Sequence, residues 1–340
     1  MTRRFPKRLH ARILNLKEHE AYIVSVRILI HKRGASGDVL RTTPVLALFP
    51  DAAVDWLVDE RNAPLLAGSS ARVLTSPALF RSRVPYDLIL SLEEGRRDLE
   101  EVYNAATWRQ IIGTYVDKGG VVRYTQSSHT WFDMSLISIY GSKAANRLKF
   151  ENRASFQQHL FGMFGRRFTG QPYHRVGPPS RSSGADDRYC ILLADKAGPR
   201  WPNKEWGYFD ECRRVLASRW QAAILQKQPS LLALAEEIGR YDLIIANDSL
   251  PMHIALGQGR MVCGLFTCTS PWEIHDYGRL RKIVSPKLRQ FYYLPARSCE
   301  ARTAIPLEAV ISAVQTLMPR HTDQPSHNLC LSSAAVQMSA

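Results

Sequence analysis

A junction between an apolar strand and a helix near the N-terminus constrains the fold more than any other feature. The run 23–30 (IVSVRILI) has the length and β-branched composition of a buried strand. The run 39–48 suits the buried face of a helix, and Gly37 and Asp38 lie between the two. Open α/β sheets bind ligands at the carboxyl ends of parallel strands. The pattern predicts a strand–loop–helix unit in which Asp38 either belongs to a ligand site or caps the helix.

A second junction of the same kind lies far along the chain. Residues 241–246 (YDLIIA) form an apolar run, and Asp248 and Ser249 then open a helical segment that ends near Gly257. Another buried strand is predicted at 261–266 (MVCGLF). Two halves that each end their strands in polar loops predict an α/β protein with two Rossmann-like domains facing across a cleft.

Length and local composition divide the chain into five parts. At 340 residues it suits two domains of ordinary size. A Gly-, Pro- and Ser-rich stretch (GPPSRSSGA) is the clearest linker. We expect a basic extension at 1–20, an N-terminal domain at 21–176, the linker at 177–185, a C-terminal domain at 186–318 and a disordered tail at 319–340.

Bulk composition indicates a soluble globular protein. The chain is 45% apolar and 22% charged, and it contains neither a run of bilayer length nor an early apolar segment typical of a signal peptide. We therefore expect a cytoplasmic protein. The six cysteines form no CxxC pair, so Cys263 and Cys268 are interpreted as buried free thiols and not as metal ligands.

The net charge of +14 is concentrated at the N-terminus. Residues 1–33 hold nine Lys or Arg against two Glu, which is half of the excess. Such a segment could contact an anionic membrane surface, a phosphorylated acceptor or nucleic acid, or could be a solvated tail. The sequence shows no paired metal ligands, RNP aromatics or recognition-helix motif, so we expect no nucleic-acid partner.

Short motifs in a fixed order resemble glycosyltransferase family 9, the ADP-heptose:lipopolysaccharide heptosyltransferases. They are 37–46 (GDVLRTTPVL), 131–135 (WFDMS), 200–206 (RWPNKEW), 248–255 (DSLPMHIA) and 269–278 (TSPWEIHDYG). The resemblance implies a GT-B architecture and transfer of a heptose, or a related sugar, from a nucleotide-sugar donor with ADP-heptose as the family default. It also implies a saccharide or glycolipid acceptor such as a lipopolysaccharide core, no cofactor and no metal, with peripheral contact at the inner membrane face.

Glycosyl transfer needs a base for the acceptor hydroxyl and groups that stabilise a diphosphate leaving group. By resemblance, Asp38 is the base, and attack opposite the leaving group inverts the anomeric centre. The implied acceptor or sugar contacts are Thr42 and Thr43, and the implied donor-binding residues are Arg200, Lys204, Asp248, Ser249 and His253. The alternatives are structural: Ser249 as a helix N-cap, His253 as a packing residue and the threonines facing their own helix.

Two departures from the family pattern concern the C-terminal half. Leu250 stands where the heptosyltransferases carry a glycine, and the segment between Trp206 and Asp248 is shorter than theirs. The shortening removes a glycine turn and an acidic residue that help to hold the nucleotide in the family. We therefore expect a smaller C-terminal sheet and an altered donor pocket. The alternative function is a non-catalytic GT-B-like protein that binds a sugar or a surface.

Overall fold

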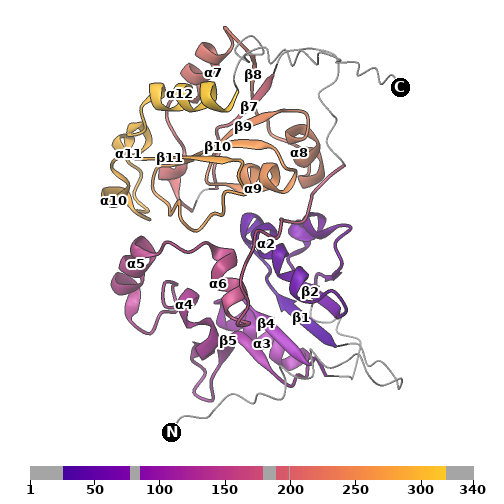
Figure 1. The fold of residues 1–340 in the computed structure, drawn as a ribbon. Coiled ribbons are helices and arrows are strands. Elements are labelled where there is room, and N and C mark those ends of the chain that lie inside the picture. Colours follow the sequence, from indigo (N-terminus) through magenta and orange to yellow (C-terminus); the bar gives the residue numbers. More distant parts are fainter. Residues whose placement is uncertain (1–25, 77–84, 179–188, 199, 319–340) are drawn as a thin grey trace, which may run out of the picture.

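The structure is a computed structural model that describes residues 26–76, 85–178, 189–198 and 200–318. The chain forms two α/β lobes, one above the other in Figure 1, and residues 163–178, the connecting segment, lead from the N-terminal lobe towards the C-terminal one. The expected basic extension, most of the expected linker and the expected tail lie outside the described residues. In the described part, no helix combines the length and apolarity that crossing a bilayer requires.

The N-terminal sheet has the strand order β3-β2-β1-β4-β5-β6. Its strands pair in parallel except at the β5–β6 edge, and the order reverses between β1 and β4. Its strands are β1 (Arg27–His31), β2 (Ala53–Leu57), β3 (Arg72–Leu74), β4 (Leu88–Ser91), β5 (Ile111–Val116) and β6 (Val122–Tyr124). The strand predicted at 23–30 is thus confirmed as β1, with a later start and an end one residue further on.

Helices connect these strands and extend the lobe towards the upper one. The α-helices are α2 (Ser36–Thr42), α3 (Arg96–Ala105), α4 (His129–Phe132), α5 (Gly141–Glu151) and α6 (Phe156–Gly162). The 3₁₀ helices are η1 (Thr43–Leu48), η2 (Glu60–Leu66) and η4 (Gln126–Ser128). A capping box begins α6, because the Ser155 hydroxyl accepts from the main chain of Gln158 while the Gln158 side chain accepts from Ser155 N–H.

The C-terminal sheet is entirely parallel, with the order β11-β10-β9-β7-β8. Its strands are β7 (Cys190–Ala194), β8 (Gln221–Ile224), β9 (Leu243–Asn247), β10 (Met261–Phe266) and β11 (Leu280–Val284). Its helices are η5 (Pro202–Lys204), α7 (Phe209–Leu216), α8 (Leu231–Ile238), α9 (Leu250–Gly257), α10 (Leu288–Phe291), α11 (Cys299–Thr303) and α12 (Leu307–Leu317). Cys263 and Cys268 are buried free thiols, as expected.

The C-terminal sheet lacks an outer strand that the N-terminal sheet has. The N-terminal sheet continues past β2 to β3, whereas the C-terminal sheet ends at β8, the strand in the corresponding position. A parallel neighbour needs a crossover of a dozen residues or more, so the chain between β8 and β9 accommodates α8 and no further strand–helix unit. The expectation of a smaller C-terminal sheet is confirmed.

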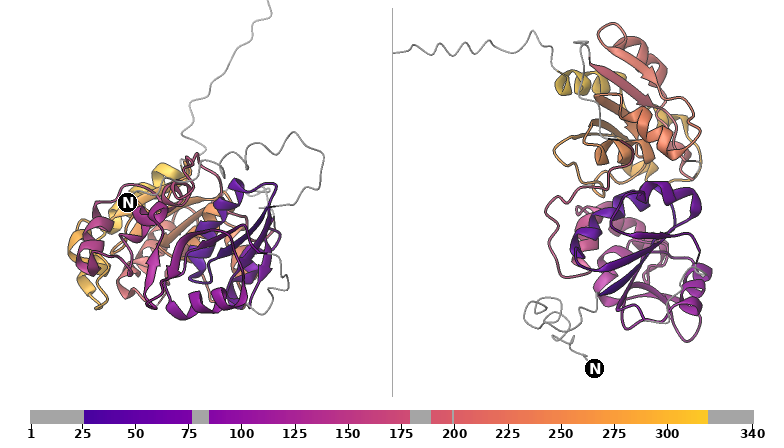
Figure 2. Two further views of the ribbon diagram at one scale, coloured as in Figure 1. Left: turned by 90° about the horizontal axis from the view of Figure 1, so that it is seen from below. Right: turned by 90° about the vertical axis from the view of Figure 1, so that its right-hand side faces the viewer.

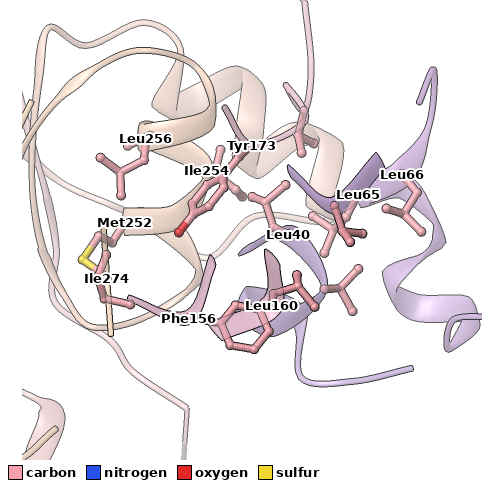
Figure 3. Close-up of a cluster of buried hydrophobic side chains, with 14 of the residues drawn as sticks. Leu40, Leu65, Leu66, Phe156, Leu160, Tyr173, Met252, Ile254, Leu256 and Ile274 are labelled. Atoms are coloured by element: carbon pink, nitrogen blue, oxygen red, sulfur yellow. The ribbon is translucent and has the colours of Figure 1, made fainter. Parts of the chain in front are cut away.

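One apolar cluster runs through both lobes. Figure 3 shows Leu40 and Phe156 of the N-terminal lobe close to Met252 and Ile254 of α9, with Tyr173 of the connecting segment among them. These side chains are buried, and α2 packs against α9 while η2 packs against α8. The side view in Figure 2 shows the lobes meeting along this face. Apolar burial therefore fixes how the two lobes sit against each other.

Candidate active site

The loops that end the central strands of both sheets meet between the lobes. In the N-terminal sheet the order reverses at β1 and β4, and in the C-terminal sheet it reverses at β7 and β9. Such reversal points leave a crevice beyond the carboxyl ends of the strands, where ligands of open α/β sheets bind. The loop after β1 leads into α2 and the loop after β9 leads into α9, and these two helices pack together.

Gly37 lies where the two lobes approach each other closely in this crevice. A Cβ atom on Gly37 would lie 2.9 Å from Cδ2 of His253, which is nearer than such atoms pack. The absence of a side chain at position 37 therefore lets the His253 ring reach the first turn of α2. This contact brings the N-terminal and C-terminal motifs into one site.

Asp38 lies in the first turn of α2 but does not cap it, because the N-cap residue is Ala35. Its carboxylate is 3.0 Å from the guanidinium of Arg41, and its side chain is 41% exposed to the crevice. Burial alone would raise the pKa of Asp38, but the charges of Arg41 and Lys32 outweigh it and lower the pKa below the usual value. Asp38 is therefore ionised at neutral pH.

Arg41 joins carboxylates from both lobes. Its buried guanidinium lies 3.0 Å from Asp38 and 3.5 Å from Glu273 of the C-terminal lobe, and its centre is 4.5 Å from the Phe156 ring centroid. Burial would lower the pKa of Arg41, but the two carboxylates raise it. The sequence assigned no role to Arg41 or Glu273, although both fall inside family-like motifs. The Arg41–Glu273 pair forms across the two lobes, so it could not be predicted from either motif alone.

The C-terminal side of the crevice holds a Lys–Asp–His cluster. Lys204 Nζ is 3.0 Å from the Asp248 carboxylate and donates to the Asp248 carbonyl at 2.8 Å, while His253 Nε2 is 3.9 Å from the other carboxylate oxygen. Burial opposes ionisation of Asp248, but Lys204 and then His253 lower its pKa to about 2. Burial lowers the pKa of His253 to about 4, so its imidazole is neutral at physiological pH. Three predicted donor residues thus lie together.

Asn247 holds the loops around this cluster and was not predicted as a site residue. Its side-chain oxygen accepts from Trp206 N–H at 3.1 Å, and its amide donates to the Asp195 carbonyl at 3.0 Å. Asn247 is fully buried at the end of β9. The loops after β7 and β9 are therefore fixed to each other.

Two other predicted donor residues lie beside the cluster. Ser249 occupies the N-cap position of α9, but its hydroxyl donates to the Asn247 carbonyl at 3.3 Å and not to the helix. Arg200 is exposed, and its guanidinium lies over the Trp201 ring at 5.6 Å from the centroid. Contact of Ser249 and Arg200 with a donor stays a prediction.

The predicted sugar contacts, Thr42 and Thr43, are both buried. Thr42 Oγ1 donates to the Asp38 carbonyl at 2.7 Å, and Thr43 Oγ1 donates to the Leu40 carbonyl at 2.6 Å. Thr43 also accepts from His174 N–H at 2.8 Å and so ties the connecting segment to α2. Both hydroxyl protons are therefore used inside the protein, and a sugar contact stays a prediction.

Glu94 is a second carboxyl group on the N-terminal side of the crevice. It follows β4 at the reversal point of the sheet. Burial raises its pKa, against the opposing effects of Lys149 and Lys32. Lys32 also lowers the pKa of Asp38, so the two carboxyl groups share one cation. The apolar run 86–92 (YDLILSL), which ends two residues before Glu94, is the sequence signal that could have drawn attention to it.

Metal ligands do not gather in the part of the chain that the structure describes: there, no three His, Cys, Asp or Glu side chains are placed to hold an ion together. The predicted independence from a metal ion stays a prediction.

Residues 200–296 match the profile of glycosyltransferase family 9 (heptosyltransferase). The match contains Lys204, Asp248, His253 and Glu273, which are the C-terminal residues of the site. No curated protein matches the chain.

Solved structures of glycosyltransferases share the fold. A family 9 glycosyl transferase from Veillonella parvula DSM 2008 has 16% identity and a TM-score of 0.58, over 88% of this chain and 99% of that one. The iron-containing dodecameric glycosyltransferase TibC from enterotoxigenic E. coli H10407 has 12% identity and a TM-score of 0.52, over 88% and 80%. E. coli ADP-heptose LPS heptosyltransferase II has 14% identity and a TM-score of 0.50, over 85% and 99%.

At these identities the solved structures establish the fold alone, and the family profile adds the sequence evidence. The prediction of a GT-B architecture is confirmed, and the prediction of a glycosyltransferase is supported at the level of the family. Both lobes therefore have the GT-B fold, and residues 200–296 are similar in sequence to glycosyltransferase family 9.

Proposed function

We propose that this protein is an inverting, metal-independent glycosyltransferase that moves a heptose or a related sugar from a nucleotide diphosphate donor to a saccharide or glycolipid acceptor. ADP-heptose is the first donor to test, because E. coli ADP-heptose LPS heptosyltransferase II shares the fold. The observation that carries the proposal is the meeting of an ionised carboxylate, Asp38, with the Lys204–Asp248–His253 cluster across the interlobe crevice.

Asp38 has the properties that the base needs. Its lowered pKa keeps it ionised, and its partial exposure leaves the carboxylate open to an acceptor hydroxyl. Arg41 fixes its orientation, since the guanidinium is itself held by Glu273 and by the Phe156 ring. Proton transfer to Asp38 as the hydroxyl attacks opposite the leaving group would invert the anomeric centre.

The C-terminal cluster suits a diphosphate. Lys204 supplies a positive charge beside the start of α9, whose first N–H groups have no partner within the helix. His253 is neutral and its Nδ1 is buried without a hydrogen-bond partner among the described residues, so the ring can serve a sugar hydroxyl or a phosphate oxygen. A site of this kind stabilises the leaving diphosphate by charge and by oriented dipoles.

A glycolipid acceptor would bring the enzyme to the cytoplasmic face of a membrane. The support is the charge of residues 1–33, which hold half of the net +14. A truncation that removes residues 1–25 should lose retention on anionic vesicles while it keeps ADP affinity. Equal retention of the full chain on neutral vesicles would contradict an electrostatic contact.

A non-catalytic, sugar- or surface-binding GT-B protein is the second candidate. The observation in its favour is the C-terminal sheet, which ends at β8 and lacks the outer unit that its N-terminal counterpart has. In the family the corresponding segment helps to hold the nucleotide.

Calorimetric titration with ADP and ADP-heptose separates the two candidates. A transferase should bind both, and Lys204→Met should weaken ADP about tenfold or more because a charge-assisted contact is lost. Lys227→Met is the matched control, since Lys227 is exposed in the loop after β8. Absence of nucleotide binding by a folded sample would favour the non-catalytic protein.

Transfer to lipopolysaccharide that lacks heptose then tests the base. Asp38→Asn should slow ADP release by about a hundredfold or more and leave ADP affinity within about twofold. Glu94→Gln should retain most activity. The reverse result would move the base to Glu94.

A further inference from the structure

A second hollow, outside the crevice, lies where the connecting segment meets the C-terminal lobe. It has a volume of about 530 Å³ and is lined by Arg175 of the connecting segment, by residues 257–259 at the end of α9 and in the turn that follows, and by His275, Tyr277 and Arg279 before β11. None of the predicted catalytic or donor-binding residues lines it.

Two arginines on this hollow make hydrogen bonds only to main-chain carbonyls in the described part of the chain. Arg175 Nη2 donates to the Gln258 carbonyl and Arg279 Nε to the Tyr277 carbonyl, each at 3.3 Å. No described carboxylate is within ion-pair distance of Arg175 or Arg279. Each guanidinium has five N–H donors, so most donors on both side chains remain for a ligand.

A third arginine adds to the positive charge. Arg260 is half-buried behind the turn, donates to the Gly239 carbonyl, and lies close enough to Arg175 for their charges to repel. Asp242 lies close enough to attract Arg260 and partly offsets its charge. Neither Arg175 nor Arg279 has such a carboxylate at ion-pair distance among the described residues, so these two carry the positive charge of the hollow.

The remaining walls suit a small polar ligand. The His275 ring packs edge-on against Tyr277, with 4.6 Å between centroids, and so forms one side. Gly257 and Gly259 also line the hollow, and a Cβ atom on Gly259 would lie 2.7 Å from the Arg279 guanidinium, so this glycine leaves room for that group. A hollow with convergent donors and little side-chain bulk has the properties of a binding site.

We propose that this hollow binds a phosphate monoester, with Arg175 and Arg279 as its main ligands. Planar guanidinium groups pair with phosphate oxygens through two parallel hydrogen bonds, and a dianion would neutralise both arginines. Because Arg175 belongs to the connecting segment and Arg279 to the C-terminal lobe, the bound group would also hold the segment against that lobe. The proposal stands apart from the proposed transferase activity.

Calorimetric titration with glycerol 3-phosphate tests the site in the full-length protein. The wild type should bind, and Arg175→Ala and Arg279→Ala should each weaken binding about tenfold. Arg281→Ala is the matched control, because it removes the same charge from an exposed position two residues further along. Its affinity should stay within about twofold of the wild type.

Phosphate could also bind at Lys204, so the titration is repeated with Lys204→Met. Retained binding in Lys204→Met, together with its loss in Arg175→Ala and Arg279→Ala, identifies the hollow; the opposite pattern overturns the proposal. So does absence of binding by the wild type, or an equal loss in Arg281→Ala. ADP titrations of the same variants report on the crevice separately, and Arg175→Ala and Arg279→Ala should keep ADP affinity.

A vesicle-binding experiment distinguishes a lipid phosphate from a soluble phosphate monoester as the ligand. Phosphatidylcholine vesicles that contain phosphatidic acid present the same monoester on a lipid. Retention that depends on Arg175 and Arg279 would indicate a lipid ligand. Binding of glycerol 3-phosphate without such retention would indicate a soluble one.

Discussion

Replacing Arg41 with methionine tests directly how charge joins the two lobes. The substitution keeps an unbranched apolar side chain and removes the guanidinium charge, which leaves Asp38 and the buried Glu273 without their shared cation. Glu273→Gln removes one carboxylate and keeps the shape. The double variant, Arg41→Met with Glu273→Gln, lacks both charges of the pair.

The geometry sets the expected magnitude. Two charges 3.5 Å apart attract by about 5 kcal/mol at an effective dielectric constant of about 20, and desolvation of both groups offsets part of this. The Glu273 side chain is only 5% exposed, so Arg41→Met leaves a buried charge unpaired and should destabilise the protein by about 3 kcal/mol. Because the double variant leaves no such charge on Glu273, the coupling energy between the positions should be about 2 kcal/mol.

Urea denaturation of the wild type, both single variants and the double variant at pH 7 measures this coupling. Arg61→Met is a suitable control, since its side chain is 75% exposed although it also faces an aspartate; it should change stability by less than about 0.5 kcal/mol. Additive effects of Arg41→Met and Glu273→Gln would refute the interlobe pair.

Three further predictions follow from single positions. Gly37→Ala should weaken ADP binding in calorimetry by displacing the His253 ring, whereas an unchanged affinity would place the donor elsewhere. The lowered pKa of Asp248, about 2, gives stability that is present above about pH 4 and is lost as the pH falls from there towards 2; Asp248→Asn should remove about 2 kcal/mol at pH 7 and little below pH 2, as followed by urea midpoints across pH. Gly113→Ala should destabilise by about 3 kcal/mol or more in thermal unfolding, because φ is +102° and a Cβ would lie 1.9 Å from a β4 carbonyl, while Gly68→Ala, with open space around it, should change stability by about 1 kcal/mol.

Short sequence patterns were sufficient to predict the central strands of both sheets and the loops that follow them. The strands that became β1 and β9 are short apolar runs, and the polar residues after them, Asp38 and Asp248, lie where parallel sheets place ligands. The small C-terminal sheet could also be predicted, because the segment before Asp248 is too short for another strand and helix. These features depend on residues close together in the sequence.

Contacts between the two lobes, and the hydrogen bonds of single side chains, could not be predicted from the sequence. Arg41 of α2 meets Glu273 of the loop before β11 only because the two lobes pack together, and nothing in the sequence around either residue indicates the other. The hydroxyls of Thr42 and Thr43 looked available for a sugar, yet both donate to the main chain of α2. Their bonding depends on backbone geometry, which a motif does not specify.

The apolar cluster shared by the lobes has a consequence for folding cooperativity. Leu40 and Phe156 on one side and Met252 and Ile254 on the other exclude water together, so neither half buries its apolar face when it folds alone (Figure 3). Each half resembles a domain in its chain topology, but its stability depends on the other. Heat should therefore melt both in one transition, and a fragment that contains only one lobe should expose a surface prone to aggregation.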